Sequence, residues 1–211
     1  MLNSNFGYAC INMQLSYPDK YGIKDTKRVT SNRSMIKKTF IEKGIQYASE
    51  LGLKNCKDLK SILKWNQNNN FNFFRVTSDL FPWCSEYKIE SLPDYDEIKE
   101  VLADTGDFIL KHKLRITSHP GPFNVLTSPH KHVVDNCIKD LSVHGQLFDL
   151  MKLSRTPYNK INIHIGGAYG DKELSMKRFC DNFELLPDSV KSRLTVENDD
   201  RASMYSVSDL Y

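Results

Sequence analysis

Three short segments constrain the fold of this chain more than any other feature, because each stops at a side chain that can bind a metal ion and is followed by turn residues. They span residues 115–119, 161–164 and 194–197, and they end on His119, His164 and Glu197. Strands that end on functional side chains and then turn are typical of the carboxyl-terminal rim of a (β/α) barrel, where active sites lie. We therefore expect these three side chains to meet at one rim.

The rest of the chain alternates between expected strands and expected helices. Strands are expected at 6–11, 71–76, 115–119, 161–164 and 194–197, and helices at 34–51, from Asn55 onward, at 94–112, from Ser128 to Phe148, around 176–183 and from Ser206 to Tyr211. No hairpin separates the strands, so right-handed crossovers and a mainly parallel sheet follow. The predicted fold class is α/β, a TIM (β/α) barrel.

The length of the chain bounds this architecture. With 211 residues the chain can bury one core, so residues 1–211 are interpreted as a single domain. A complete barrel needs eight β/α units in roughly 250 residues, and about five are recognisable. We therefore expect a partial barrel, the N-terminal portion of a longer one, whose exposed first and fifth strands invite self-association.

Composition adds few limits on function. The net charge of +3 is too mild to establish a polyanionic partner by itself. Five cysteines without paired spacing argue against a disulfide framework. The N-terminus lacks a basic and apolar signal segment, and no apolar run reaches membrane-spanning length. We expect an intracellular protein, nuclear or cytoplasmic, with no membrane partner.

The residue types at the three strand ends indicate metal chemistry. Imidazole and carboxylate groups are ligands of divalent ions such as Zn²⁺ or Mn²⁺, and a carboxylate can bridge two ions. Taken singly, each of His119, His164 and Glu197 is better explained as a hydrogen-bonded side chain. Their shared position at three strand ends favours a metal site. The absence of a Gly-x-Ser-x-Gly turn, a Walker loop and a Gly-x-Gly-x-x-Gly turn argues against a serine nucleophile and a nucleotide cofactor.

A second group of aromatic and polar side chains is expected on the same rim. Rings beside phosphate-binding side chains suit the unstacked bases of a nucleic acid. Two of the rings, Trp83 and Phe123, could instead fill the mouth of the barrel, and for Trp83 we favour this packing role. The group comprises Tyr8, Trp83, Phe123 and Tyr169, interleaved with Asn12, Arg75 and Lys172.

Several blocks of sequence, read in order, resemble the UV-damage endonuclease family across nearly the whole chain. They are residues 7–12, 65–66, 74–83, 119–121, 128–129, 164–172 and 197–200. The resemblance implies a TIM-barrel, metal-dependent DNA repair nuclease that cuts the phosphodiester bond 5′ of a damaged nucleotide, such as a pyrimidine dimer or photoproduct. It also implies damaged double-stranded DNA as the partner and a divalent metal cofactor, typically Mn²⁺, with Zn²⁺ or Mg²⁺ as alternatives.

The resemblance also implies roles for individual residues. His119 and His164 match metal ligands, and Glu197 matches the carboxylate that bridges metals and takes part in catalysis. Asn12 matches a catalytic residue near the scissile phosphate. The implied contacts to DNA or the lesion are Tyr8, Pro122 and Phe123, and Pro122 and Phe123 match the wedge that enters the duplex. Arg75, Tyr169 and Lys172, from the aromatic and polar group on the rim, complete the expected DNA contacts.

Three features depart from the family pattern. Pro122 stands where the family generally has a glutamine. Asp79 stands where some members have a histidine ligand, so it remains a candidate for binding a hard cation. The later strands with further ligands are absent, so we expect ligands for one metal and weak or no incision. Two alternatives stay open: a metal-dependent sugar isomerase or epimerase with a small closed pocket, and a non-catalytic DNA-binding fragment.

Overall fold

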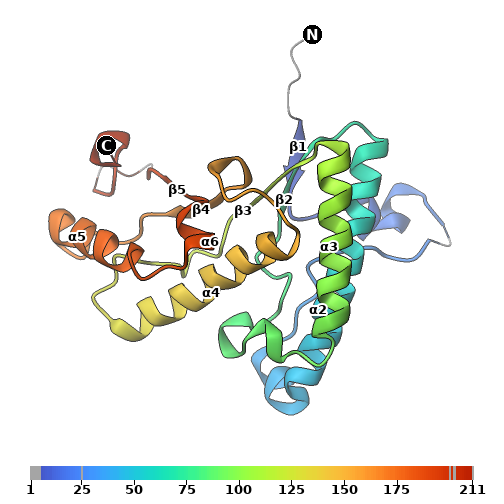
Figure 1. The fold of residues 1–211 in the computed structure, drawn as a ribbon, viewed down its shortest axis with the longest axis horizontal. Helices are drawn as coiled ribbons and strands as arrows, with labels where there is room; N and C mark the ends of the chain where they lie inside the picture. The colour runs from blue at the N-terminus through green and yellow to red at the C-terminus, as the bar shows by residue number, and fades with distance from the viewer. Residues whose placement is uncertain (1–5, 25, 200, 202, 211) are drawn as a thin grey trace, which may run out of the picture. The chain divides into compact units, whose positions relative to one another are not determined.

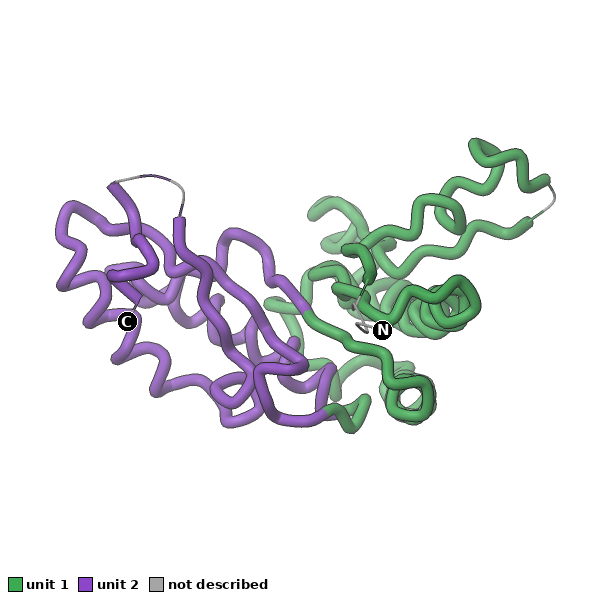
Figure 2. The backbone as a smooth tube through the Cα atoms, turned by 90° about the horizontal axis from the view of Figure 1, so that it is seen from above, with its two compact units in different colours: residues 1–117, 150–153 green, residues 118–149, 154–211 purple. Residues whose placement is uncertain are grey.

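The computed structural model describes residues 6–24, 26–199, 201 and 203–210. The chain forms two compact units, which Figure 2 shows in different colours. Unit 1 comprises residues 1–117 and 150–153, and unit 2 comprises residues 118–149 and 154–211. The single domain expected from the chain length stays a prediction.

The strands hydrogen bond in the order of the chain, β1-β2-β3-β4-β5, in one five-stranded sheet (Figure 1). A parallel sheet in chain order, with helices in the crossovers, is the pattern of consecutive units of a (β/α) barrel. The predicted α/β fold with five such units is therefore confirmed. The strands are β1 (Gly7–Ala9), β2 (Phe73–Val76), β3 (Arg115–Ser118), β4 (Ile161–His164) and β5 (Leu194–Glu197), and the α-helices are α1 (Met13–Ser16), α2 (Lys37–Asn68), α3 (Tyr95–His112), α4 (Lys131–Leu150), α5 (Lys172–Phe183) and α6 (Asp188–Lys191).

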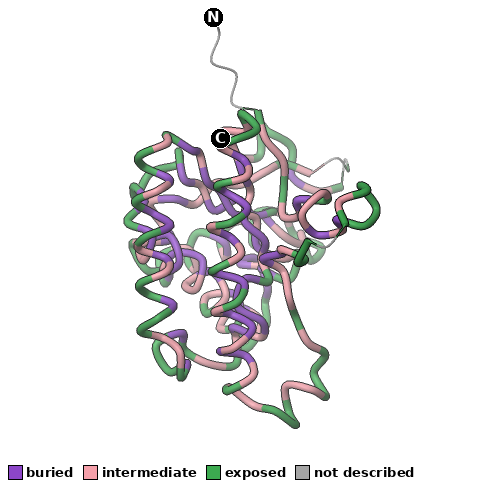
Figure 3. The backbone as a smooth tube through the Cα atoms, turned by 90° about the vertical axis from the view of Figure 1, so that its right-hand side faces the viewer, coloured by how far each residue is buried: buried purple, intermediate pink, exposed green. Residues whose placement is uncertain are grey.

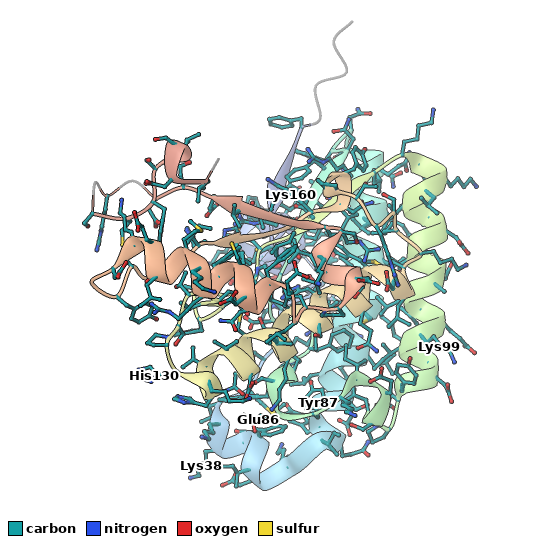
Figure 4. The ribbon with its side chains drawn as sticks, turned by 60° about the vertical axis from the view of Figure 1, so that its left-hand side comes forward. Lys38, Glu86, Tyr87, Lys99, His130 and Lys160 are labelled. Atoms are coloured by element: carbon teal, nitrogen blue, oxygen red, sulfur yellow. The ribbon has the colours of Figure 1, made fainter. Side chains whose placement is uncertain are left out.

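In unit 1, α2 and α3 lie side by side (Figure 1). Apolar side chains at helical spacing, such as Leu59, Leu63, Ile98 and Leu102, are buried. The opposite faces are charged, and Lys99 projects from α3 into solvent (Figure 4). Buried and exposed residues therefore alternate along the helices (Figure 3). None of the helices in the described ranges has both the length and the apolar character needed to span a bilayer.

Two helices cover this stretch, as predicted, but the predicted boundary, with the second helix capped by Asn55, was wrong. The two helices join in one element, α2, at a kink at Gly44, whose φ of 64° and ψ of −160° are not helical. Asn55 is buried inside α2, where its Oδ1 accepts from the backbone N–H of Arg33 at 3.0 Å and its amide donates to the carbonyl of Leu80 at 3.1 Å. These tertiary hydrogen bonds occupy the side chain that would otherwise cap a helix.

Two other predicted elements are shorter than expected. The strand expected at residues 6–11 ends at Ala9, because Cys10 has a φ of 62° and left-handed backbone cannot continue a strand. The helix expected at the C-terminus is a 3₁₀ turn over Val207–Leu210, and Tyr211 lies outside the described residues.

In unit 2, the buried guanidinium of Arg193 fixes the segment that leads into β5. Arg193 has an exposed fraction of 0%. It donates to the carbonyl of Ser154 at 3.0 Å, to the carbonyl of Ser189 at 2.9 Å and to Oδ1 of Asp149 at 2.8 Å. Asp149 lies near the end of α4 and also binds Arg155 at 2.7 Å. The start of β5 is thereby tied to α4.

Candidate metal centre

The strand ladder of unit 2 brings the predicted side chains to one end of the sheet. The parallel pairing of β4 with β5 places His164 beside Glu197 and Asn162 beside Thr195. Because residues two apart share one face of a strand, these side chains lie on the same side of the ladder. His119 follows the last residue of β3, which pairs with β4.

The side chains of His119, His164 and Glu197 converge on one carboxylate oxygen. Glu197 Oε1 lies 3.0 Å from Nε2 of His119 and 2.9 Å from Nε2 of His164. One candidate ligand atom from each residue lies within 4.8 Å of the other two, and no other such group of His, Cys, Asp or Glu occurs among the described residues. The structure thus brings the three predicted residues together. Their role as metal ligands stays a prediction.

The donor set suits a cation. Nδ1 of His119 lies 3.1 Å from the carbonyl oxygen of Pro120, which can only accept, so Nδ1 carries the proton. In the neutral ring, Nε2 then points a lone pair at Glu197 Oε1, which is also an acceptor. Two acceptors at 3.0 Å need a positive charge to hold them together, either a proton on the ring or a metal ion.

Asn162 orients the carboxylate, and the sequence analysis did not identify it. Its Nδ2 donates to Glu197 Oε2 at 2.5 Å, while its Oδ1 accepts from Thr195 Oγ1 at 2.7 Å. Asn162 therefore occupies one oxygen of Glu197 and leaves the other facing the histidines. The signal available in the sequence was a polar residue between two isoleucines, two positions before His164.

The carboxylate of Glu197 is held in its charged form. Burial alone would raise its pKa, but hydrogen bonds from His119 and Asn162, together with the charges of His119 and His164, outweigh burial and lower the pKa. An ionised carboxylate beside two imidazoles is what a divalent cation requires of its ligands.

Tyr8 and Asn12 form a hydrogen-bonded pair in unit 1. Asn12 Nδ2 donates to the Tyr8 hydroxyl at 2.6 Å, and the hydroxyl donates to Asn66 Oδ1 at 2.5 Å. Burial raises the pKa of Tyr8 to about 12, against the opposing effect of its hydrogen bonds with Asn12 and Asn66. Both residues line a pocket of about 380 Å³ with the rings of Trp65 and Phe71.

Three further predicted residues of unit 1 lie in or after β2. Arg75 has a buried Nε with no hydrogen-bond partner among the described residues. Asp79 is exposed in the following loop and does not belong to the group of His119, His164 and Glu197. Its role as a ligand stays a prediction. Trp83 donates through Nε1 to the carbonyl of Met35 at 2.9 Å and packs against Phe40.

The remaining predicted residues lie in unit 2. Pro122 and Phe123 are exposed in the loop after His119. Tyr169 has a φ of 48°, and the guanidinium of Arg178 lies 5.6 Å from the centre of its ring. Lys172, the first residue of α5, pairs with Asp209 at 3.4 Å. Asp200, in the block after Glu197, lies outside the described residues.

Known proteins resemble the chain over most of its length. It is 36% identical to the UV-damage endonuclease of Schizosaccharomyces pombe over 208 residues, which are 97% of this chain and 33% of that protein. It is 37% identical to the UV DNA damage endonuclease of Clostridium perfringens over 176 residues, which are 83% of this chain and 41% of that protein. The chain thus spans less than half the length of these two relatives.

A solved structure and a family model agree with these relatives. The crystal structure of SacUVDE superimposes with a TM-score of 0.78 and 32% sequence identity, covering 97% of this chain and 63% of that one. The model of the UV-endonuclease UvdE family matches residues 4–211. Because this model covers nearly the whole chain, the chain belongs to the UV-endonuclease UvdE family, and it carries the cluster of His119, His164 and Glu197 at its strand ends.

Proposed function

We propose that this chain carries a metal-dependent endonuclease function that hydrolyses the phosphodiester bond 5′ of a damaged nucleotide, such as a pyrimidine dimer, in double-stranded DNA. The observation that carries the proposal is the convergence of His119 and His164 on Glu197 Oε1. Relatives that are named UV-damage endonucleases support the substrate class.

The proposed cofactor is one divalent ion, most suitably Mn²⁺. Two imidazole nitrogens and one carboxylate oxygen suit Mn²⁺ or Zn²⁺ better than Mg²⁺, which prefers oxygen ligands. When bound, such an ion lowers the pKa of water and stabilises charge on phosphoryl oxygens. His119 would be held in ligand geometry by Pro120, and Glu197 by Asn162.

Other side chains are proposed to bind the DNA. The buried Nε of Arg75 has no hydrogen-bond partner within the described part of the chain, which supports a phosphate contact, because an ion pair would compensate its burial. Lys172 is proposed as a second phosphate contact, and the Tyr169 ring as a base contact. The Asn12 amide and the Tyr8 hydroxyl are proposed to act at the scissile phosphate and at the lesion.

Metal content and DNA binding test the proposal together. Elemental analysis after dialysis should find Mn²⁺ in the chain, and His164→Ala and Glu197→Ala should lose it while remaining folded. The control is His130→Ala, which changes the exposed histidine beside the start of α4 (Figure 4). Metal retained by both site variants would refute the candidate metal centre.

The substrate class has its own test. Binding to a duplex with one thymine dimer should exceed binding to the same undamaged duplex and should weaken as salt rises, with nicking 5′ of the dimer that depends on Mn²⁺. Equal binding to both duplexes without nicking would leave a non-catalytic DNA-binding role. Absence of DNA binding together with retained metal would favour the sugar isomerase alternative.

The edges of the sheet suggest a further partner. In the part of the chain that the structure describes, β1 and β5 end the hydrogen-bonded order of strands. Unpaired strand edges can pair with another copy of the chain. We include self-association in the proposal, and sedimentation at increasing protein concentration tests it.

A further inference from the structure

The loop after His119 contains a tight turn with an exposed aromatic ring at its corner. The backbone N–H of Asn124 donates to the carbonyl of Gly121 at 3.2 Å, so Pro122 and Phe123 are the two corner residues of a β-turn. Proline suits the first corner position because its ring presets φ. Phe123 is 86% exposed, the highest value among the large hydrophobic side chains described.

The side chain of Asn124 anchors this turn to α4. Asn124 is buried, with 6% exposed. Its Nδ2 donates to the carbonyl of Gly121 at 3.1 Å and to Oδ2 of Asp140 in α4 at 2.6 Å. A hydrogen bond to an ionised carboxylate is short and stronger than one between neutral groups. The turn is therefore closed by its backbone and fixed to the helix by one amide.

The same loop begins at the candidate metal centre. His119 contacts the carbonyl of Pro120, the residue before Gly121. Phe123 is four residues from His119, so their Cα atoms can be at most about 14 Å apart. At about 3.4 Å per nucleotide along one strand, that reach covers about four nucleotides. One loop can thus place a candidate metal ligand near a phosphate and a ring near a neighbouring base.

An exposed ring on a fixed tip has a chemical use. Aromatic side chains stack on bases that have left the helical stack, whatever the base identity. A tip that is already ordered loses less conformational freedom on binding, which increases affinity. Pro122 supplies the order within the turn, and Asn124 with Asp140 supplies the order relative to α4.

We propose that Asn124 and Asp140 are positioning residues that hold the Phe123 ring for stacking on a base displaced at a lesion. The preference for damaged DNA then depends on two side chains that do not themselves touch it. This inference rests on the proposed function, because it requires a damaged duplex as the ligand.

The test measures the preference for damage, defined as the ratio of the dissociation constants for an undamaged duplex and for the same duplex with one thymine dimer. Asn124→Ala should lower this ratio about five- to tenfold, since the tip must then be ordered on binding. Asp140→Ala should do the same, whereas Asp140→Asn should keep most of the preference because its amide oxygen still accepts. Affinity for undamaged DNA should stay unchanged.

A double-mutant cycle separates positioning from general loss of structure. Phe123→Ala should lower the ratio at least as much as Asn124→Ala, and Asn124→Ala should add nothing in the Phe123→Ala background. Asp135→Ala is the matched control, since Asp135 also lies on α4 and pairs with Lys131 on the surface. If thermal unfolding shows that Asn124→Ala does not fold, Asp140→Ala replaces it in the cycle, because it removes the same hydrogen bond and Asp140 is partly exposed.

The outcomes are distinct. Equal effects of Asn124→Ala in both backgrounds would overturn the inference, because Asn124 would then act independently of the ring. A normal preference in Phe123→Ala would also overturn it and leave the proposed function standing. A wild-type chain with no preference for the damaged duplex would overturn the proposed function and this inference together.

Discussion

Removal of the Asn162 side chain should weaken Mn²⁺ binding without changing any ligand. Asn162→Ala deletes the amide that donates to Glu197 Oε2 at 2.5 Å. A hydrogen bond to a charged group contributes about 1.5–3 kcal/mol, and about 1.36 kcal/mol corresponds to a factor of ten. Because Glu197 is partly exposed, water replaces part of the lost interaction. We therefore expect about 10- to 50-fold weaker binding, within the usual range for residues that orient a ligand.

Titration calorimetry with Mn²⁺ measures this effect, and two further variants serve as an intermediate case and as a control. Thr195→Val removes only the hydroxyl that orients the Asn162 amide, so its loss should be smaller. Asn136→Ala changes an exposed asparagine on α4 and should bind as the wild type does. If Asn162→Ala bound Mn²⁺ within about twofold of the wild type, the carboxylate would not depend on its orienting partner, and the reasoning would fail.

Three further predictions concern stability. Arg193→Met should lower the free energy of unfolding by about 3–5 kcal/mol in urea titrations, because it leaves buried carbonyls and Asp149 without their donor. A loss no larger than that of Arg155→Ala, which changes an exposed partner of the same carboxylate, would contradict this. Burial would raise the pKa of Asp149, but hydrogen bonds and charges from Arg155 and Arg193 lower it. Its stabilisation is therefore complete above about pH 5 and is lost as the pH falls through the lowered pKa. In acid titrations Asp149→Asn should flatten this part of the stability curve, and an unchanged acid limb would refute the assignment. Gly106→Ala should lower the melting temperature although alanine favours helices, because its Cβ would lie 1.8 Å from the carbonyl oxygen of Met151. An unchanged or higher melting temperature would show that the backbone at residue 106 can move away from that at Met151.

The ends of the strands were predictable because their signal is local. His164 and Glu197 are the last residues of short strands, His119 directly follows one, and all three precede turn residues. Parallel strands in chain order place these ends at one edge of the sheet, so convergence follows from topology without side-chain detail. The confirmed fold and the proximity of these residues have this common origin.

The residues that orient the site were not predictable, because their partners are distant in sequence. The hydrogen bond from Asn162 to Glu197 joins positions 35 apart and depends on the register of β4 with β5. The prediction for Asn55 failed because a local rule was applied: the sequence indicated a helix cap, but hydrogen bonds with the backbone of Arg33 and Leu80 occupy its side chain.

The meaning of Pro122 also needed the structure. The sequence shows only a ring at this position that cannot donate a hydrogen bond. The hydrogen bond between Asn124 and Gly121 shows that Pro122 occupies a corner of a turn, where its value is the fixed backbone angle.

The separation of the candidate ligands along the chain links metal supply to folding. His119 and Glu197 are 78 positions apart, with α4, β4, α5 and α6 between them. An unfolded chain cannot present them at one point, so a cation would bind almost exclusively after β3, β4 and β5 have come together. At a free concentration about one hundred times its dissociation constant, a cation would add about 2.7 kcal/mol to the stability of the folded form. Where the ion is scarce, the candidate metal centre would be incomplete, and unit 2 would lose this added stability against unfolding and proteolysis.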